Sequence, residues 1–497
     1  MLSISEIKRL IDDDRTSEKK LKAKEGQRYY EADHDILKCR LFYYNGDGNL
    51  VEDTYRSNIR ISHPFFTELA DQLAYYLLSF KENPIRAREN VEGLQDHLDR
   101  YFGSKFWSEI GELITGAYTK GFEYIYAFPA YDTALKKNRL KFQCADSMGV
   151  VEVREKDTDD GCKYIIYWYV DRIEKGRKKI KRIQVWSEND ITYYVQSGAG
   201  KITLDSSVEN NPRPHVIGTD EETGERKGYS LGYIPFWRLD NNRKQFSGLK
   251  PIKGLIDDYD LMMCGLSNNL QDFDTPLHVV SGFQGDNLDE LQHNLKTKKV
   301  VGVDADGDVN VKTVDVPYQA RQAKAAEDKE AIYHFGMGFN SSQTGDGNIT
   351  NVVIQSRYSL LEMKAKKMED AVSALLEDDI IPIVLEEINA ENGTDFQISD
   401  VDIVFDRDTV TNETENISNA KIEAETRQIE VNTILNVAAN IGDEKALKAI
   451  CEIMDWDFDE LEGQLEQMNE AEDSLSNAKA TLEGVEPTET EPAAGEQ

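Results

Sequence analysis

The stretch "GFNSSQTGDGNITNVVIQ", Gly338–Gln355, separates two segments with helical spacing and has no hydrophobic residue between Phe339 and Ile349. Glycine, asparagine and serine favour turns, so the stretch predicts a polar loop. After it, apolar residues recur at steps of four and three, which indicates a long amphipathic helix. Its apolar stripe is Ile354, Tyr358, Leu361, Ala365, Met368, Val372 and Leu375. Pro382 should kink or interrupt this helix, because proline lacks an N–H and clashes with the preceding turn.

Upstream of the loop, two helical segments enclose a short insert with β character. The first segment begins near residue 248 and ends at Pro276. Its apolar stripe is Leu255, Tyr259, Met262, Leu266, Leu270 and Phe273. The insert contains β-like segments arranged around "DADGD", which we expect to be a turn. The second helical segment, "PYQARQAKAAEDKEAIYHFG", leads back to the loop.

This order of segments predicts a stalk, in which a helix leaves the body, carries a small module and returns as a second helix. One subunit would cover the apolar stripes of both arms poorly, which favours contact between copies. Gly254, Gly265 and Ser267 lie in the first arm, where small residues allow a neighbouring helix to approach closely. A helical hairpin buried within one chain is the alternative, and the residues leave both open.

The remaining segments predict a mixed α+β fold. Residues 1 to 130 show mostly helical spacing, which extends through "FWSEIGELITGAYTKGFEYIYAF". From about 138 to 240 the period changes to two in short segments rich in Val, Ile, Tyr and Trp, which indicates an antiparallel β layer. A further strand is expected in "FQISDVDIVFD", and helices are expected from about 414 to 468.

The composition limits the possible functions. The 497 residues include 92 acidic and 58 basic ones, for a formal net charge of -34. Binding DNA by the bulk surface requires basic side chains against the phosphates, so tight nucleic-acid binding of that kind is not expected. Five scattered cysteines indicate reduced thiols in a cytoplasmic protein. The sequence has no apolar run long enough for a membrane span and no apolar signal-peptide core.

Several short motifs imitate active sites but fail on spacing. "SGAGKIT" has Val195 five residues before Gly200 and Ile202 after Lys201, where a phosphate loop needs Gly and Ser or Thr, so a hairpin turn is the better interpretation. "DADGDVN" has its glycine too early for a calcium loop. The seven histidines form no HExxH motif or close pair, and no GxSxG elbow exists. The sequence thus predicts a protein that is not an enzyme, with no catalytic residue, metal site or cofactor.

Four pieces of the sequence occur in the order and spacing of a known family. They are "NIRISHPFFTELADQLAYYLLSFKENPI" (Asn58–Ile85), "GAYTKGFEYIYAFPAYD" (Gly116–Asp132), "YIPFWRLDNNRKQFSGLKPIKGLIDDYDLMMCGLSNNLQDF" (Tyr233–Phe273) and "GDGNITNVVIQSRYSLLEMKAKKMED" (Gly345–Asp370). With these pieces the chain resembles the portal proteins of tailed double-stranded DNA bacteriophages, in the subgroup typical of phages of Gram-positive hosts. The resemblance runs from about residue 25 to 465.

The resemblance implies the phage portal fold, with a helical stem, a mixed α/β wing, a small β clip, a long kinked helix and a helical crown in a ring-forming chain. The wing would cover 1–247, the descending stem helix 248–275, the clip 276–316 and the returning stem helix 317–337. A tunnel loop would follow at 338–353, the long kinked wing helix at 354–399 and the crown at 400–470. The composition of 471–497, which is acidic and lacks aromatic residues, separately predicts a disordered tail.

The resemblance also implies a function and a set of partners. The family forms a homo-oligomeric ring, most often of twelve copies, at one vertex of the capsid. DNA is packaged through its channel by the terminase and later leaves through it. Expected partners are the terminase large subunit, a head-completion or adaptor protein, the major capsid and scaffolding proteins, and double-stranded DNA without sequence specificity, with no membrane. The protein would lie in the virion after assembly in the bacterial host cytoplasm.

Within such a ring the polar loop would project into the channel. Lys or Arg there would bind phosphates and slow the DNA, whereas neutral amides, hydroxyls and one carboxylate would not. The loop from Gly338 to Val352 contains no Lys or Arg. The candidate channel residues are Asn340, Ser341, Ser342, Gln343, Thr344, Asp346 and Asn348.

Two further groups of charged residues are candidates for function. Asp257, Asp258 and Asp260 on the descending stem helix would form acidic rings if they face the channel, and a solvated outer face is the equal alternative. Lys296, Lys298 and Lys299 in the clip would serve terminase or adaptor docking, and a solvated charged turn is the simpler alternative.

Two other functions are considered beside the portal. One is a scaffold or adaptor protein of the virion that forms no ring. The other is a nucleic-acid enzyme such as a terminase subunit, which requires a phosphate loop or a carboxylate metal cluster. The failure of "SGAGKIT" as a phosphate loop counts against the enzyme.

Overall fold

The computed structural model describes residues 2–54, 56–89, 91–132, 137–155, 161–174, 176–219, 226–273, 277–283, 291, 302–312, 318–340, 351–407, 413–454 and 458. Two compact units divide the chain: Met1–Gly345 with Gln355–Thr409, and Asp346–Ile354 with Val410–Gln497. Helices and antiparallel strands occur together, as the predicted α+β class requires. No helix of these described ranges has both the length and the apolar composition for crossing a membrane.

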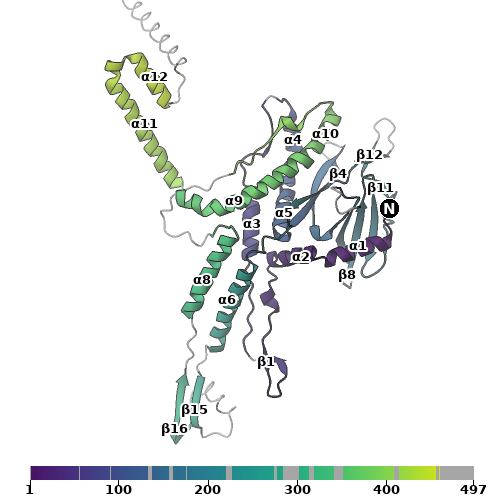
Figure 1. The fold of residues 1–497 in the computed structure, drawn as a ribbon, viewed down its shortest axis with the longest axis vertical. Helices are drawn as coiled ribbons and strands as arrows, with labels where there is room; N and C mark the ends of the chain where they lie inside the picture. The colour runs from purple at the N-terminus through teal and green to yellow at the C-terminus, as the bar shows by residue number, and fades with distance from the viewer. Residues whose placement is uncertain are drawn as a thin grey trace, which may run out of the picture. The chain divides into compact units, whose positions relative to one another are not determined.

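A helical core organises the first unit (Figure 1). The predicted stripe of the long helix is part of it, because Leu361, Ala365, Met368, Val372 and Leu375 are all buried. Burying a large apolar side chain contributes about 1.5–3 kcal/mol relative to leaving it in water. The helices that contribute to this core include α3 (Phe65–Leu77), α5 (Ser104–Lys120), α6 (Lys253–Phe273), α9 (Asn351–Leu375) and α10 (Ile381–Asn392).

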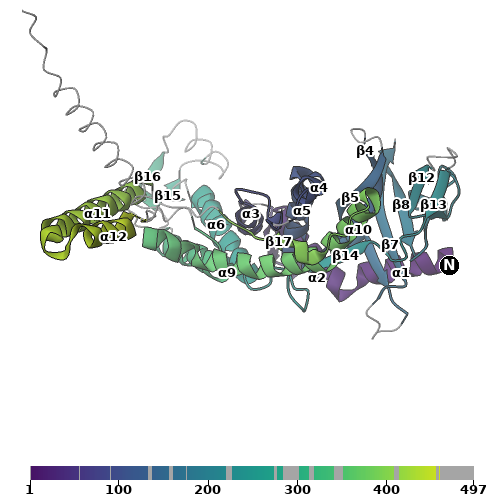
Figure 2. The same cartoon turned by 90° about the horizontal axis from the view of Figure 1, so that it is seen from above.

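The interruption predicted at Pro382 takes the form of a wide helical turn. Leu376–Ile380 form a π-helical segment between α9 and α10. Pro382 then lies in the first turn of α10, where a missing N–H removes few hydrogen bonds. The helix therefore continues past the proline with a change of direction, which Figure 2 shows.

The predicted antiparallel layer is present as two sheets. One contains six strands in the order β10-β9-β8-β7-β6, with β11 paired to β9, and the other has the order β14-β4-β5. Helix α1 (Ile4–Thr16) crosses the first sheet and inserts Ile7 and Ile11 among its apolar side chains (Figure 2). The strands of the first sheet are β6 (Val150–Val153), β7 (Tyr164–Glu174), β8 (Lys178–Trp186), β9 (Asp190–Ser197), β10 (Ile202–Leu204) and β11 (Arg213–Pro214). Those of the second are β4 (Phe122–Asp132), β5 (Lys137–Ala145) and β14 (Phe236–Asp240).

Two sequence expectations about this layer have different outcomes. The "SGAG" turn joins β9 to β10 as a hairpin, which confirms that interpretation. The layer, however, begins earlier than predicted, because α5 ends at Lys120 and β4 starts at Phe122. The prediction that helical spacing continues through "GFEYIYAF" is therefore wrong. Gly121 ends the helix in the left-handed conformation with φ 95°, and β4 then pairs with β14 and β5 on its two edges, which outweighs the local spacing.

We expect Gly121→Ala to destabilise the first unit by about 2–4 kcal/mol. A left-handed alanine costs about 1–2 kcal/mol, and its Cβ would overlap the carbonyl oxygen of Gln245. Gly46→Ala is the control, because a Cβ there meets no atom within 4 Å and should change stability by less than about 0.5 kcal/mol. Denaturant unfolding followed by circular dichroism measures both. Equal stability of the two variants would contradict the role given to Gly121.

Two helices and a hairpin form the predicted stalk (Figure 1). Helix α8 (Tyr318–Phe335) packs beside α6, where Lys324 pairs with Asp258 at 2.7 Å. A Cβ on Gly265 would lie 3.0 Å from the Arg321 side chain of α8, whereas one on Gly254 would meet nothing within 4 Å in this chain. Gly265 thus lies at the contact between the two arms.

The hairpin at the end of the stalk consists of β15 (Leu277–Phe283) and β16 (Val303–Lys312). "DADGD" lies inside β16, where the register shifts between the pairs Ser281↔Asp308 and Phe283↔Val303. The prediction of a turn at "DADGD" is therefore wrong. The extra residues are accommodated as an irregularity within one strand, which is the usual role of a β-bulge.

The remaining elements of the first unit are small. The turn predicted in "YYNGDGNLVE" joins two short strands that form a hairpin below the body (Figure 1). The elements are α2 (Glu18–Tyr30), β1 (Phe42–Tyr44), β2 (Leu50–Glu52), β3 (Ile85–Ala87), α4 (Leu94–Tyr101), β12 (Val216–Thr219), β13 (Arg226–Tyr229) and β17 (Val401–Ile403).

The boundary between the two units differs from the expected start of the crown at residue 400. Strand β17 pairs with β3, so residues 401–403 belong to the first unit, and the second unit resumes at Val410. The described part of the second unit contains α11 (Glu413–Ile441) and α12 (Asp443–Met454), and these two helices pack together. The predicted tail at 471–497 lies outside the described residues.

Candidate functional site

The polar loop begins at a tight turn held against helix α3. After α8 ends, Gly338 N–H donates to the carbonyl oxygen of Tyr333 at 2.9 Å. A Cβ on Gly338 would overlap the Leu69 side chain of α3, so glycine is required by close packing there. Met337 has φ 52°, which completes the change of chain direction. This turn fixes the first residues of the loop against the body.

Phe339 is fixed by contacts on both its backbone and its ring. Its N–H donates to Gln72 Oε1 at 2.9 Å, and its carbonyl oxygen accepts from Gln72 Nε2 at 2.8 Å. Its ring stacks on Tyr358 of α9, with the ring centroids 4.3 Å apart and the ring planes inclined by 13°. Tyr358 in turn stacks on Tyr76 of α3 at 6.0 Å. The start of the loop is thus joined to α3 and to the helix that follows the loop.

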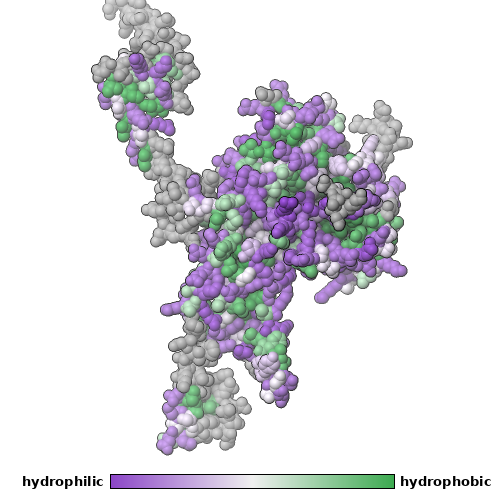
Figure 3. All heavy atoms as spheres, in the orientation of Figure 1, coloured by the Kyte–Doolittle hydropathy of each residue, from purple (hydrophilic) through white to green (hydrophobic). Residues whose placement is uncertain are grey.

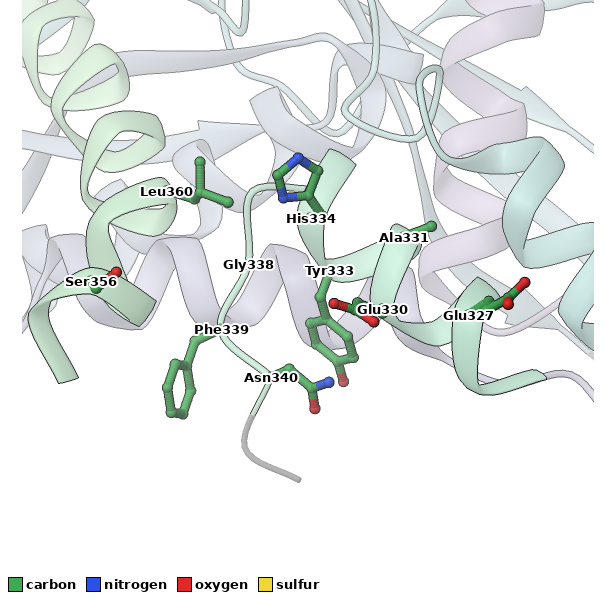
Figure 4. A pocket seen from close by; sticks show the side chains of 10 residues that line it. All are labelled: Glu327, Glu330, Ala331, Tyr333, His334, Gly338, Phe339, Asn340, Ser356 and Leu360. Atoms are coloured by element: carbon green, nitrogen blue, oxygen red, sulfur yellow. The ribbon is translucent and has the colours of Figure 1, made fainter. Parts of the chain in front are cut away.

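A hollow of about 560 Å³ opens beside this turn (Figure 4). Helix α8 supplies Glu327 and Glu330, and Asn340 of the loop reaches the same hollow. Among the described residues, the lining includes two carboxylates and no Lys or Arg. The lining residues are Glu327, Glu330, Ala331, Tyr333, His334, Gly338, Phe339, Asn340, Ser356 and Leu360. The described lining of this hollow therefore places two carboxylates near the start of the loop.

The structure describes one of the seven loop candidates. Asn340 lies at the end of the described part of the loop and lines the hollow. Ser341, Ser342, Gln343, Thr344, Asp346 and Asn348 lie outside the described residues, as do Lys296, Lys298 and Lys299.

Lys364 connects the long helix to the loop's starting turn. Its Nζ donates to the carbonyl oxygens of Gly336 at 3.0 Å and Leu69 at 3.3 Å. It also lies 4.7 Å from the centre of the Tyr118 ring. Burial lowers the pKa of Lys364 to about 7, because the charged amine loses its hydration. The amine therefore acts here through hydrogen bonds to backbone oxygens of α3 and of the turn after α8.

A second polar group joins α9 to α3 further along the helix. Arg407 donates to Glu362 at 2.6 Å and also pairs with Glu369. The Tyr76 hydroxyl donates to Glu362 as well, and the guanidinium of Arg407 lies 5.5 Å from the centre of the Tyr76 ring. Burial and the Glu362 hydrogen bond raise the pKa of Tyr76 to about 12, so the hydroxyl keeps its proton.

Asp260 is buried within the chain and not on a surface. Its side chain is 0% exposed, and its carboxylate accepts from His34 Nδ1 at 2.6 Å and from His63 Nδ1 at 2.7 Å. Burial raises the pKa of Asp260, but the hydrogen bonds from His34 and His63 outweigh burial and leave it below the ordinary value. His34 Nε2 lies 3.3 Å from the carbonyl oxygen of Tyr29, so both ring nitrogens have a polar partner. A carboxylate in this position cannot belong to an acidic ring on a channel wall.

The other two stem aspartates are partly exposed and have partners. Asp257 accepts from the Tyr29 hydroxyl and pairs with Lys253 at 2.7 Å. Asp258 pairs with Lys324 of α8 at 2.7 Å, and both side chains are more than a third exposed. Their contacts fix the two stem helices to the body and to each other, and they leave carboxylate surface toward solvent.

Asp260 is one end of a regular series of contacts that sequence reasoning missed. The extended segment Ser57–His63 runs along α6, and alternate N–H groups donate to side chains four residues apart on the helix. The pairs are Ser57 with Asp272 at 3.0 Å, Ile59 with Asn268 at 2.6 Å, Ile61 with Cys264 at 3.2 Å and His63 with Asp260 at 3.0 Å. Two extended residues span about 6.6 Å and four helical residues about 6 Å, so the two repeats match. The signal in the sequence is a polar residue at every fourth position of α6.

We expect Asp260→Asn to destabilise this contact by about 2–4 kcal/mol, because three donors lose a buried carboxylate partner. Asp258→Asn is the matched control, and removing its exposed ion pair should cost less than about 1 kcal/mol. Hydrogen exchange of residues 57–63 and thermal unfolding measure both variants. Since the pKa of Asp260 is depressed in the folded chain, its contribution should be present above pH about 4 and disappear as the pH falls below that value. Equal exchange in the two variants would contradict the role assigned to Asp260.

The potential metal ligands are dispersed among the described residues. Among them, no three His, Cys, Asp or Glu side chains come together in a way that could hold a metal ion. All five cysteines are described and unpaired. The structure does bring together the start of the polar loop, the carboxylates of Glu327 and Glu330 beside it, and the contacts that hold Phe339 to α3 and α9.

Comparisons with known proteins point the same way. A family model described as "Phage portal protein, SPP1 Gp6-like" matches residues 9–475. The portal protein of Bacillus phage SPP1 is 25% identical over 351 residues, which cover 70% of this chain and 67% of that protein. The portal protein of Clostridium phage phiCD119 is 22% identical over 355 residues, which cover 69% of this chain and 74% of that protein.

Proposed function

The chain belongs to the family of SPP1 Gp6-like phage portal proteins, and from this we propose that its copies form a closed ring around a channel for double-stranded DNA. The ring lies at one capsid vertex of the virion and contains twelve copies. DNA is packaged through it by the terminase and is later ejected through it. The protein has a structural role, and the energy for transport comes from another protein.

The observation that carries this proposal is the cation-free loop with a fixed starting point. Residues 338–353 contain no Lys or Arg, and the hollow beside them is lined by Glu327 and Glu330. Each Lys or Arg contact with phosphate would add favourable free energy, and a ring would multiply that attraction by the number of copies. A conduit needs the opposite property, because DNA must pass without being held.

Uncovered apolar side chains support assembly from many copies. On the stem, Leu261 and Leu270 of α6 are 58% and 51% exposed, and Phe335 of α8 is 58% exposed. In the β1–β2 hairpin, Tyr44 is 74% exposed and Leu50 is 59% exposed. Figure 3 shows hydrophobic side chains gathered on the stem and on this hairpin. Extended apolar patches on a soluble protein favour contact with another surface, and head-to-tail contacts close into a ring.

Within the proposed ring, we assign to the chain the parts expected from the resemblance, with two changes. The wing, stem, clip and tunnel loop keep the boundaries expected from the resemblance, while the crown begins near Val410 because β17 belongs to the first unit. Asp257 and Asp258 are proposed to add negative charge along the stem, and buried Asp260 is not. Lys296, Lys298 and Lys299 are proposed to dock the terminase large subunit or a head-completion adaptor. The capsid and scaffolding proteins would surround the ring.

Native mass measurement tests the ring against a scaffold or adaptor that forms none. We expect particles of several hundred kilodaltons with a central opening in electron micrographs, whereas a single chain weighs 56.5 kDa. Leu261→Asp should shift the particles toward smaller species, because it places a charge in a contact between copies. A wild-type protein that stays a monomer, or particles without an opening, would rule out the ring.

The loop's composition yields a separate prediction about transport. Asn340→Lys with Gln343→Lys should leave rings intact and slow DNA filling of heads by about tenfold or more, because each copy gains two phosphate contacts. The control exchanges the two amides, Asn340→Gln with Gln343→Asn, which changes shape but adds no charge. Packaging assays with purified heads measure both. Normal filling by the lysine variant would contradict the low-adhesion argument while leaving the ring untouched.

A further inference from the structure

A cationic site lies on a different part of the first unit, where α1 crosses the six-stranded sheet. Lys8 and Arg15 of α1 face Lys181 of β8, and Lys179 stands two residues before Lys181 on the same strand. Successive side chains of a strand alternate between its faces, so Lys179 and Lys181 share one face. This concentration of positive charge is unusual in a chain with a net charge of -34.

The cations surround a hollow of about 260 Å³. Three isoleucines form its apolar part: Ile11 of α1, Ile183 of β8 and Ile202 of β10. These isoleucines also belong to the hydrophobic cluster that attaches α1 to the sheet, and Gly198 and Ala199 of the turn between β9 and β10 complete the lining. Figure 2 shows α1 crossing the strands at this place.

Trp168 of β7 positions two of the cations. The guanidinium of Arg15 lies 6.0 Å from the centre of its ring, and the Lys181 amine lies 5.1 Å from it. Cations over an aromatic face are held by the ring's quadrupole with about 0.5–1 kcal/mol at exposed sites. The two charges are therefore oriented on one side chain that also lines the hollow.

The negative charge at this site is too small to balance the cations. Asp12 lines the hollow and lies 4.0 Å from Arg15, with both side chains about half exposed. Within the described ranges, Lys8, Lys179 and Lys181 take part in no ion pair within 4.0 Å. Burial lowers the pKa of Lys181, and repulsion from Arg15 and Lys179 lowers it further. An anion in the hollow would relieve this repulsion.

We propose that this hollow binds an acidic peptide segment of a separate protein chain. Carboxylates of the segment would pair with Lys8, Arg15 and Lys181, and an apolar side chain between them would occupy the isoleucine floor. Such a segment uses both properties of the hollow, whereas inorganic phosphate would use only the charge. The proposal concerns a protein partner of the wing and does not depend on transport through the channel.

Duplex DNA fits the same surface less well. A duplex carries one charge per about 1.7 Å and is stiff over about 150 base pairs, so it would continue past the cations over the acidic remainder of the chain. That repulsion acts over a Debye length of about 8–10 Å at ordinary salt. A short flexible segment can end within the cationic site. The apolar floor also has no counterpart on a phosphate backbone.

The test uses the assembled full-length protein and a fluorescein-labelled synthetic peptide of about ten alternating Glu and Leu residues, roughly 33 Å when extended. We expect saturable binding in fluorescence anisotropy at about 0.05 M salt that weakens at about 0.5 M. Lys181→Glu should weaken binding by about tenfold or more, and the milder Lys8→Gln should weaken it less. The matched control is Lys105→Glu on α5, an exposed lysine with the same change of charge outside the site.

Several outcomes would overturn the proposal. One is the absence of saturable peptide binding. Another is equal binding of the same peptide with Gln in place of Glu, since carboxylates would then play no part. Tighter binding of a short DNA duplex than of the peptide would assign the site to nucleic acid. An equal loss in Lys105→Glu and Lys181→Glu would show that net charge, and not this hollow, is responsible. Circular dichroism and native mass of each variant establish that folding and assembly are unchanged.

Discussion

The two hydrogen bonds between the Gln72 amide and the backbone of Phe339 determine where the polar loop begins. A segment of small neutral residues buries little surface and has weak conformational preferences, so its course depends on how its ends are held. Stacking of Phe339 on Tyr358 joins this end to α9, the helix that follows the loop. The end of the loop that adjoins α8 is therefore fixed to both α3 and α9.

Lys364 holds the same turn from within the core. Its amine binds the carbonyl oxygens of Gly336 and Leu69, and so ties α9 to α3 and to the turn after α8. The hollow side of this junction is acidic, because Glu327 and Glu330 line it. A lysine on that side would attract phosphate, whereas a buried lysine behind the loop strengthens the junction without offering its charge to DNA. The position of a lysine therefore determines whether its charge stabilises the fold or is accessible to a phosphate.

Helical periodicity predicted helices α6, α8 and α9 and the buried stripe of α9 correctly, because these depend on spacing within one segment. Predictions from spacing were wrong where contacts with distant segments determine the local structure. Residues 122–132 have apolar residues at helical spacing, yet they form β4 because β5 and β14 supply hydrogen-bond partners on both edges. Asp260 looked like an exposed acidic residue, and its burial depends on His34 and His63, which lie about two hundred positions away. The four-residue polar repeat of α6 was visible in the sequence, but its meaning required the segment that runs beside it.

The three neighbouring aspartates of α6 show that the net charge of a chain does not describe how charge is distributed over its surface. Asp260 is buried between two histidines, Asp258 pairs across the stem with Lys324, and Asp257 binds Tyr29 of the body and a lysine one turn earlier on α6. Adjacent positions on a helix point in directions about 100° apart, so identical side chains meet three different surroundings. Part of the chain's acidity is therefore used to attach the stem to the body, and only the remainder is available to repel DNA. The cations beside α1 are the converse case, because Asp12 is the one carboxylate among the described residues that line their hollow, where it lies 4.0 Å from Arg15.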